Sequence, residues 1–322
     1  MRKVFGLPGV SGWALTMGMT TGFPAGAQAT IQLTQQGDLT PPEAERLGWL
    51  SHFCNPMTLI IVIGIGLFEH SSAGYWLIII HWMSGILAFL TFVSMRHTFR
   101  NKGSNLSINS KQVKHSSSPL HLRVWRAIHQ AHTRDGRSFG KLLGESVSHA
   151  VQTLMVVGGY IIIMAVIIHL INSYIVPRIP NYYVAGFVEL HLGAKAISTA
   201  STLSSVMQWS LLSAILGWSG ICAILQTISP LITTGMRWLP FIVIRLLHGT
   251  YAFVITIILW TPMRILPLET KPAFFYWPNV ATDISQIADM WSRVPLMLVF
   301  QGCILISLLL ISWSIALVTR SR

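Results

Sequence analysis

Glu189 is the residue whose position in this sequence most suggests chemistry. It lies in a mainly apolar stretch from Val184 to Thr202, one helical turn from Gly193 and six residues from Lys195. An acid within a bilayer is costly and usually marks a solute or ion pathway. The same residues also fit an amphipathic helix in the membrane interface, with Glu189 and Lys195 in contact with water. Both interpretations stay open at this point.

Arg245 and His248 form a second candidate pair. They are three residues apart, so they share one face of a helix that the sequence predicts from Trp238 to Trp260. Arg245 is too deep in that stretch to reach water, which predicts a partner inside the protein, either a carboxylate or the carbonyls of a hairpin. Glu189 is the carboxylate that we expect. A structural ion pair, a gating role and a contact to substrate all fit.

The other reactive residue types argue against an enzyme. His81 and His169 are isolated in apolar stretches, where a neighbouring helix usually satisfies a histidine and a metal or proton role is the alternative. Cys54, Cys222 and Cys303 form no C-x-x-C pair. The sequence has no nucleophile elbow, H-E-x-x-H spacing or phosphate loop. We therefore expect no enzyme activity, no catalytic residue, no bound metal and no cofactor.

The elements that must position these side chains are membrane helices. Hydrophobic residues make up 52% of the 322 residues, and only 10% are Asp, Glu, Lys or Arg. Soluble domains have roughly 25% charged residues. Several charge-free stretches reach the roughly 20 residues that cross a bilayer as a helix. They are Leu47 to Phe68, Ala73 to Met95, Ser146 to Val176 and Val294 to Thr319. The sequence predicts an all-α, multi-pass protein of the cell membrane.

A basic loop separates two halves of the chain. Ten of the 22 Lys and Arg residues lie between Arg96 and Lys141, where the only acid is Asp135. The positive-inside bias places this loop in the cytoplasm. We expect it to rest on anionic lipid and not to bind nucleic acid.

Two charge-free stretches are longer than one membrane helix needs. They run from Val4 to Gly37 and from Ala196 to Met236. Helix breakers interrupt both, Gly22-Phe23-Pro24 with Gly26 in the first and Gly217-Trp218-Ser219-Gly220 in the second. Half-length legs around a tight tip predict re-entrant hairpins at about 8–37 and 206–234, with two ordinary spans as the alternative in each. Backbone groups at such tips need partners in protein or a polar cavity.

A broken helix follows the first hairpin. Thr40-Pro41-Pro42-Glu43 has the pattern of an N-cap with a capping box. Within Cys54-Asn55-Pro56, the proline removes a donor and clashes with the carbonyl of His52. This predicts a helix from 41 to 68 that is interrupted there, with freed carbonyls and an Asn55 amide available to a ligand. A hairpin and a broken helix, then a similar hairpin in the second half, are typical of secondary transporters built from inverted repeats.

Motifs in both halves carry a resemblance to a known family. The first half contains Leu7-Pro8-Gly9-Val10-Ser11-Gly12, the stretch from Met17 to Ala27, and Leu39 through Glu43-Ala44-Glu45-Arg46-Leu47 to Cys54-Asn55-Pro56. The second half contains Glu189 with Gly193, Leu216 to Gly220 with Gln226 and Ser229, and Arg245-Leu246-Leu247-His248-Gly249. In order and spacing, from about residue 4 to 260, these motifs resemble the sporulation integral membrane protein YlbJ and its relatives.

The resemblance implies a nucleoside-recognition or Gate domain, which also occurs in concentrative nucleoside transporters, ferrous iron transport protein B and the spore maturation proteins. The family pattern has further membrane helices before the first hairpin. We therefore expect Met1-Arg2-Lys3 to lie in the interior of that pattern. The basic loop from Arg96 to Lys141 has little family character.

We expect three parts in the chain. Residues 1–95 form a first Gate-like repeat with a hairpin, the broken helix and a span at 73–95, and residues 96–145 form the cytoplasmic loop. Residues 146–322 form the second half, with a span at 146–174, an interfacial helix at 184–203, the second hairpin at 206–234, and spans at 237–261 and 294–319. An inverted repeat would place the second hairpin on the outer side.

Two functions fit this organisation. The first is transport of a small polar solute or ion, with alternating access around a site at the midplane. The lack of charge at the predicted tips favours a neutral solute or an ion held by carbonyls, and a nucleoside is only what the domain's name suggests. The second is a membrane scaffold or channel component without a transport cycle, needed in spore envelope (cortex) formation, as the resemblance implies. A homo-oligomer is compatible with both.

The solute-binding candidates lie at the predicted breaks. They are Thr20, Thr21, Gly22, Pro24 and Gln28 in the first hairpin, Cys54, Asn55 and Pro56 in the broken helix, Glu189, and Trp218, Ser219 and Gln226 in the second hairpin. Trp218 is the tryptophan best placed to touch a solute, because most others lie near span ends. Arg245 and His248 are the structural or gating candidates.

Overall fold

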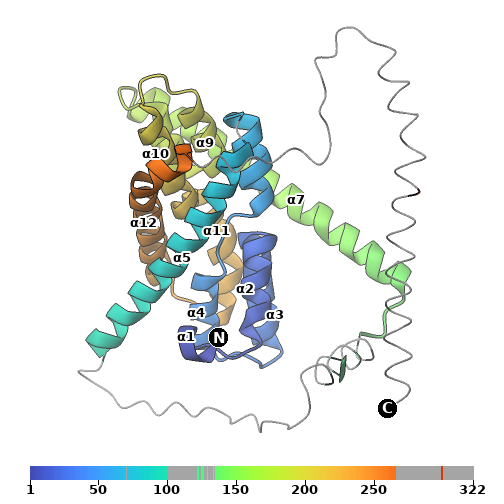
Figure 1. Cartoon of the computed structure of the whole chain (residues 1–322). Coiled ribbons are helices and arrows are strands. Elements are labelled where there is room, and N and C mark those ends of the chain that lie inside the picture. The colour runs from blue at the N-terminus through green and yellow to red at the C-terminus, as the bar shows by residue number, and fades with distance from the viewer. Residues whose placement is uncertain are drawn as a thin grey trace. The chain divides into compact units, whose positions relative to one another are not determined.

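The computed structural model describes residues 1–69, 71–100 and 135–265, with single positions between 122 and 133 and at 299. Residues 1–270 form one compact unit and residues 271–322 another. The helices described here all belong to the first unit (Figure 1). The predicted span at 294–319 and most of the basic loop lie outside the described residues. The predicted three-part division of the chain stays a prediction.

The first half of the unit has the order hairpin, broken helix, long helix. Its elements are α1 (Arg2–Phe5), α2 (Ser11–Thr20), α3 (Phe23–Gln35), α4 (Pro41–Leu50), the π-helix η1 (Thr58–Leu67) and α5 (Ser71–Arg100). Gly22, at the tip between α2 and α3, has a φ of 107°, which an L side chain rarely adopts. The predicted capping box forms, because both Thr40 N and Oγ1 donate to Glu43 Oε2. The predicted break separates α4 from η1.

The second half begins with a long helix and then repeats the same order. Its elements are α7 (Phe139–Leu170), continued by the π-helix η2 (Ile171–Ile175), α8 (Asn181–Val188), α9 (Leu190–Ser198), α10 (Ser205–Trp218), α11 (Gly220–Leu231), the short 3-10 helix η3 (Ile232–Thr234) and α12 (Trp238–Ile265). Helices α8 and α9 pack closely against each other. Glu189, the single residue between them, is extended, with φ −142° and ψ 128°. The second hairpin is therefore α8–α9.

The structure corrects two sequence predictions here. Helices α10 and α11 were expected to be the legs of a hairpin at 206–234, but they follow each other as one interrupted membrane span, Ser205–Thr234. Ser219 and Gly220, both with positive φ, offset the helix without folding it back. A helix break and a hairpin tip share the same glycine-rich signal, so the sequence did not separate them. The predicted interfacial helix at 184–203 is the real hairpin, bent at Glu189.

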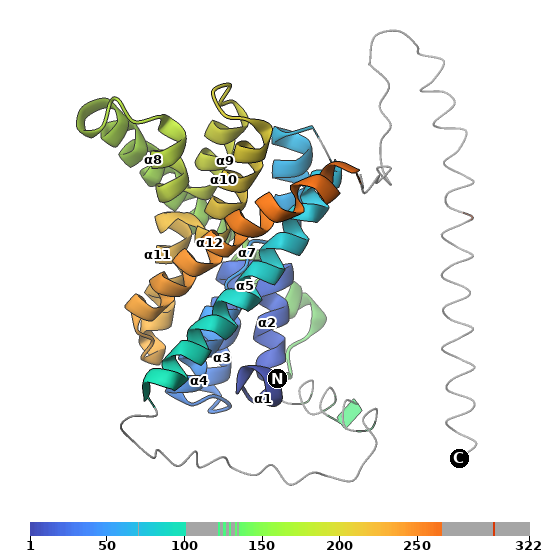
Figure 2. The same cartoon turned by 60° about the vertical axis from the view of Figure 1, so that its left-hand side comes forward.

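The hairpins of the two halves lie toward opposite ends of the unit, as expected for an inverted repeat. Figures 1 and 2 both show α2 and α3 toward the end of the unit where the N-terminus lies, and α8 and α9 toward the opposite end. The legs of both hairpins have 8 to 13 residues. At about 1.5 Å per residue they are too short for the ~30 Å hydrocarbon core of a bilayer. Insertion of both hairpins halfway into the membrane, from opposite sides, stays a prediction.

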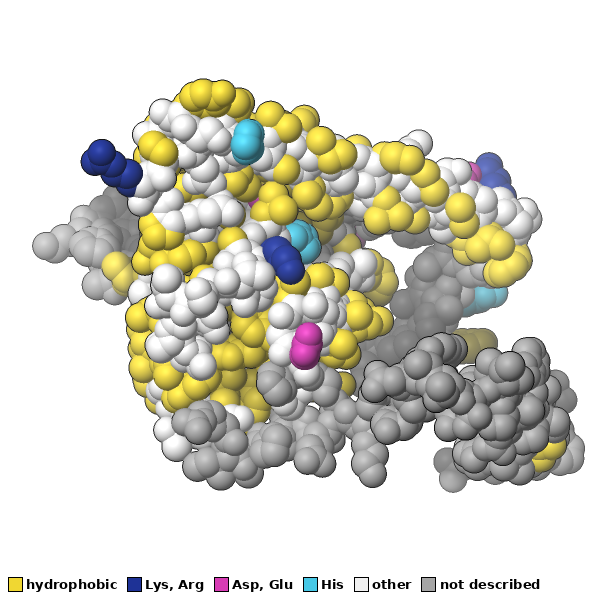
Figure 3. Space-filling model, turned by 90° about the horizontal axis from the view of Figure 1, so that it is seen from above, with side chains coloured by type: hydrophobic (Ala, Val, Ile, Leu, Met, Phe, Trp, Pro, Cys, Tyr) yellow, Lys and Arg dark blue, Asp and Glu magenta, His cyan; other side chains and the backbone are white. Residues whose placement is uncertain are grey.

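Several helices are long and apolar enough to cross a membrane. Within the part of the chain that the structure describes there are four such segments, Ser72–Met95, Phe139–Ile175, Ser205–Thr234 and Trp238–Met263. Their outward faces are apolar, with Ile163 and Ile258, for example, more than half exposed. Figure 3, a view from above onto the described surface, shows mainly hydrophobic and uncharged groups with isolated charges. The protein is an all-α, multi-pass membrane protein.

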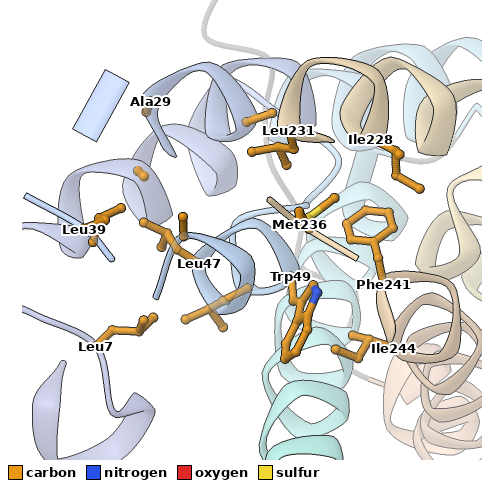
Figure 4. Packing of buried hydrophobic residues seen from close by; sticks show 14 of the residues in the cluster. Leu7, Ala29, Leu39, Leu47, Trp49, Ile228, Leu231, Met236, Phe241 and Ile244 are labelled. Carbon is orange, nitrogen blue, oxygen red and sulfur yellow. The ribbon is translucent and has the colours of Figure 1, made fainter. Parts of the chain in front are cut away.

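The core that holds the first hairpin is built from both halves of the chain. Leu47 and Trp49 from α4 pack with Leu231 at the end of α11 and with Phe241 and Ile244 of α12 (Figure 4). All five are almost completely buried. Such packing leaves no room between the halves for lipid, so the repeats form one body in this structure.

Candidate functional site

The first hairpin holds the break in the first broken helix through its glycines. A Cβ atom at Gly18 would lie 1.9 Å from the carbonyl oxygen of Ser51, and one at Gly26 would lie 2.5 Å from the same oxygen. At the tip, a Cβ on Gly22 would lie 3.3 Å from the Cβ of Asn55. Glycine at every fourth residue from 18 to 26 therefore lets the unwound segment, residues 51–55, lie directly on the hairpin backbone.

The second hairpin tip packs on the second break in the same way. A Cβ at Gly220 would lie 3.0 Å from the carbonyl oxygen of Val188 and 3.2 Å from the Cα of Glu189. The indole N–H of Trp218 donates to the carbonyl oxygen of Phe187 at 2.9 Å. The two side chains also stack, with ring centroids 5.2 Å apart and planes 9° apart. Each hairpin tip is thus fixed to the broken helix of its own repeat.

The two breaks meet at His52, which the sequence analysis did not select. Its Nε2 atom lies 2.9 Å from the Ser219 hydroxyl in the second break. Its Nδ1 atom lies 3.0 Å from the Thr227 hydroxyl on α11. Phe23, at the start of α3, stacks on the imidazole at 5.0 Å. His52, Ser219 and Thr227 are all at least 97% buried. We call His52, Ser219 and Thr227 together the crossing.

Arg245 joins the crossing from α12 and binds backbone carbonyls. Its Nη1 donates to the carbonyl oxygen of His52 at 2.7 Å, and its Nη2 donates to that of Trp49 at 3.1 Å. The Trp49 carbonyl lies in the last turn of α4, at the negative end of its helix dipole, and the His52 carbonyl follows the C-cap Ser51. The guanidinium therefore satisfies the end of the first half-helix. The prediction named the carbonyls of a hairpin as one alternative, but the carbonyls that Arg245 binds belong to the first broken helix.

The predicted pairing of Arg245 with Glu189 is wrong. The Glu189 carboxylate accepts from the Leu192 N–H at 2.7 Å and lies 2.8 Å from Nδ1 of His191. It is the N-cap of α9 and is 98% buried, whereas the His191 side chain is 37% exposed. Position 189 is fixed to its own hairpin because a carboxylate satisfies the free N–H groups at a helix start. Glu189 thus forms the second hairpin tip and lies neither in an interfacial helix nor beside Arg245.

His81 and His248 connect α5 and α12 to the crossing. Nε2 of His81 accepts from the backbone N–H of Cys54 at 2.9 Å, so it satisfies a donor freed by the break. His248 lies with Nδ1 3.0 Å from Nη1 of Arg245 and with Nε2 2.9 Å from the carbonyl oxygen of His81. The two imidazole rings are 4.6 Å apart. Backbone groups at the first break are therefore satisfied by side chains from two other helices.

The remaining solute-binding candidates occupy three kinds of place. Asn55 accepts the Thr58 N–H at 2.6 Å and so caps the second half-helix, which Pro56 begins. Gln226 donates to Cys222 Sγ at 3.2 Å, and its buried Oε1 has no hydrogen-bond partner among the described residues. The other candidates in the first hairpin are exposed or half-buried: Thr20, Thr21, Pro24 and Gln28. The hydroxyl of Thr20 donates to a carbonyl of its own helix. Whether any of these residues contacts a solute stays a prediction.

A further contact ties the halves together away from the crossing. Arg237, just before α12, donates from Nε and Nη2 to the two carboxylate oxygens of Glu45 on α4, at 2.9 and 2.8 Å. The hydrogen bond to Glu45 raises the pKa of the Arg237 guanidinium.

Among the residues that the structure describes, no group of three His, Cys, Asp or Glu side chains is placed to hold a metal ion.

Two hairpins toward opposite ends of the unit, two broken helices and a polar crossing between them define a multi-pass integral membrane protein with broken helices. The chain is 32% identical over 282 residues to the sporulation integral membrane protein YlbJ of Bacillus subtilis (strain 168), a match that covers 82% of this chain and 67% of that protein. The chain belongs to the YlbJ family. No protein-family model and no solved structure matches it.

Proposed function

We propose that this chain carries a small polar solute or ion across a membrane by moving one repeat against the other. The observation that carries the proposal is the crossing, where the two helix breaks are joined by the hydrogen bond between His52 and Ser219. Unwound backbone in a bilayer is tolerated only where it is packed in protein or lines a polar cavity. In secondary transporters, such breaks are where solutes and coupling ions bind.

The second hairpin takes a larger part in this proposal than the sequence suggested. Its tip brings a buried carboxylate, Glu189, and a half-exposed imidazole, His191, to the second break. The first tip, at Gly22, brings backbone and the ring of Phe23 to the first break, and residues 21–24 carry no charge. A polar solute or a cation held between the tips would therefore meet its charged partners on the side of the second hairpin.

Sporulation is the setting that the family name indicates for this activity. The basic segment from Arg96 to Lys141 would rest on anionic lipid at the cytoplasmic surface. No nucleoside-specific contact enters the proposal, since the crossing offers a serine, a threonine and imidazole groups and no free aromatic face: the His52 ring is already stacked on Phe23.

Cysteine accessibility tests the proposal. Single cysteines at Thr21, Asn55 and His191, in a chain whose own cysteines are replaced, would be exposed to a membrane-impermeant maleimide in proteoliposomes. We expect labelling at all three positions, and suppression by a transported solute from a panel of sugars, amino acids, nucleosides and small ions. Cysteines at Asp38 and Ser201, which are exposed in the outer loops of the two hairpins, serve as controls that no solute should protect. Solute-independent labelling at every position, with no saturable uptake of any panel member, would refute transport and favour a scaffold in spore envelope formation.

A further inference from the structure

An apolar groove of about 370 Å³ lies between the second hairpin and α12. Its floor is α10, represented by Leu211, Ile215 and Trp218, and its walls are α8 and α12. The volume is within the ~300–1,000 Å³ typical of small-molecule sites. None of the functions assigned to the crossing uses this groove.

Two glycines create the groove by bringing both walls onto the same floor. A Cβ at Gly186 of α8 would lie 2.8 Å from Cγ2 of Ile215, and one at Gly249 of α12 would lie 2.8 Å from the carbonyl oxygen of Ala214. Both helices therefore touch α10 directly through backbone. The two edges of the groove are formed by larger side chains beside these contacts, Phe187 and Leu246. Each is about half exposed.

The open side of the groove faces hydrocarbon. Its α10 and α12 residues, 211–218 and 246–253, lie inside the two membrane spans Ser205–Thr234 and Trp238–Met263. At that depth water is absent, and an empty groove would forfeit van der Waals contacts along its whole lining. The occupant must therefore be apolar and must come from the bilayer.

The two ends of the groove differ in polarity. At the inner end, the Phe187 ring stacks on Trp218, and the indole N–H already donates to the Phe187 carbonyl oxygen. An occupant therefore needs no hydrogen-bonding group at this end. At the other end Tyr182 and Tyr183, whose rings are 4.5 Å apart, lie at the start of α8. Tyrosines at this place suit the membrane–water interface, and the exposed Arg178 precedes them. One end is thus suited to a methyl terminus and the other to a head group.

We propose that the groove is a binding site for one acyl chain of a membrane phospholipid, which enters past Tyr182 and Tyr183 and ends against Phe187 and Trp218. The chain fills the space between α8 and α12 and supports the second hairpin from the lipid side. Because apolar chains gain little hydrophobic free energy on leaving a bilayer, the selectivity comes from packing in the glycine-walled groove.

Photo-crosslinking in nanodiscs tests this site with the full chain and a phosphatidylglycerol that carries a diazirine at the end of one acyl chain. We expect preferential labelling of the peptides that contain Phe187 and Trp218. Thr250→Trp fills the groove from an exposed position whose hydroxyl bonds only to its own helix, and should reduce that labelling several-fold. Leu246→Trp narrows the same groove and should do likewise.

Ile258→Trp is the matched control, because it adds the same bulk on α12 at a position that is 68% exposed and outside the groove. Labelling that is even over all exposed apolar positions, or that is equally unaffected by all three substitutions, would show ordinary surface lipid and overturn the proposal. Absence of lipid labelling at Phe187 and Trp218 in the unmodified chain would also overturn it, because another part of the protein or a second copy would then fill the groove.

Discussion

Arg245 shows how a single residue makes a broken helix possible inside a membrane. Its guanidinium has five N–H donors in a fixed fork, which suits two carbonyls at the end of one helix and an imidazole beside them. In the structure those partners are the carbonyls of Trp49 and His52 and Nδ1 of His248. Among the described residues none forms an ion pair with this arginine. Its role at the crossing is thus to donate hydrogen bonds to backbone carbonyls of the first broken helix.

Removing that guanidinium should destabilise the protein. Arg245→Met keeps an unbranched apolar chain but removes the charged donor to two buried carbonyls, which should lower the free energy of unfolding by about 2 kcal/mol. Denaturant titration in detergent micelles would measure the change. Leu246→Met, at a half-exposed neighbouring position, should change it by less than ~0.5 kcal/mol. Equal stability of Arg245→Met and the unmodified chain would mean that the break needs no side-chain donor.

His52 and Ser219 should be energetically coupled although they are 167 residues apart in sequence. A double-mutant cycle of His52→Ala and Ser219→Ala isolates their contact, and we expect a coupling energy of about 1 kcal/mol. The same titration gives all four stabilities. Pairing His169→Ala with Ser219→Ala is the control, since His169, on α7, has no contact with the crossing among the hydrogen bonds and ring contacts of the described residues. Additivity within ~0.3 kcal/mol for the first pair would argue against the crossing.

At the scale of elements, each hairpin depends on glycines that face a backbone. Gly18→Ala would place a Cβ 1.9 Å from the Ser51 carbonyl oxygen, so hairpin and break must separate. We expect a large loss of folded, monodisperse protein in size-exclusion chromatography. Gly12→Ala, in the same helix, meets nothing within 4 Å and should be neutral or slightly stabilising, because alanine favours the helix by ~1 kcal/mol. Similar yields from both variants would show that the close contact at Gly18 is not required.

The elements of the first half could be predicted from the sequence, and those of the second half only in part. The breaker cluster at Gly22 to Gly26 and the proline at position 56 indicate a tip and a break, because one is followed by a capping box and the other by an apolar helix. In the second half, Gly217 to Gly220 suits a tip or a break equally well. The real tip has no glycine or proline at all: it is turned by Glu189, whose carboxylate caps the next helix.

The crossing was harder to predict for a different reason. Its contacts join residues far apart in the chain, such as His52 with Thr227 and Trp49 with Arg245, and no local spacing encodes them. One signal was present, since each hairpin carries a pair of glycines on either side of its tip, 18 and 26 around Gly22, and 186 and 193 around Glu189. Matching those pairs would have identified α8–α9 as the second hairpin.

For the whole molecule, the proposed alternating access requires that the two repeats insert into the membrane from opposite sides. The loop between α3 and α4 and the loop between α9 and α10 are the outer ends of the two hairpins, and both carry exposed residues, Asp38 and Ser201. The positive-inside bias of the basic segment between the halves would place the first loop in the cytoplasm. The second must then lie on the other side of the membrane.

Labelling of single cysteines at these two positions tests this claim most directly. Asp38→Cys and Ser201→Cys, in the full chain with Cys54, Cys222 and Cys303 replaced, would be treated with a membrane-impermeant maleimide in sealed right-side-out vesicles, before and after permeabilisation. Opposite insertion predicts that Ser201→Cys is labelled in intact vesicles and that Asp38→Cys is labelled only after permeabilisation. Labelling of both positions from the same side would contradict the inverted repeat, and with it the proposed alternating access.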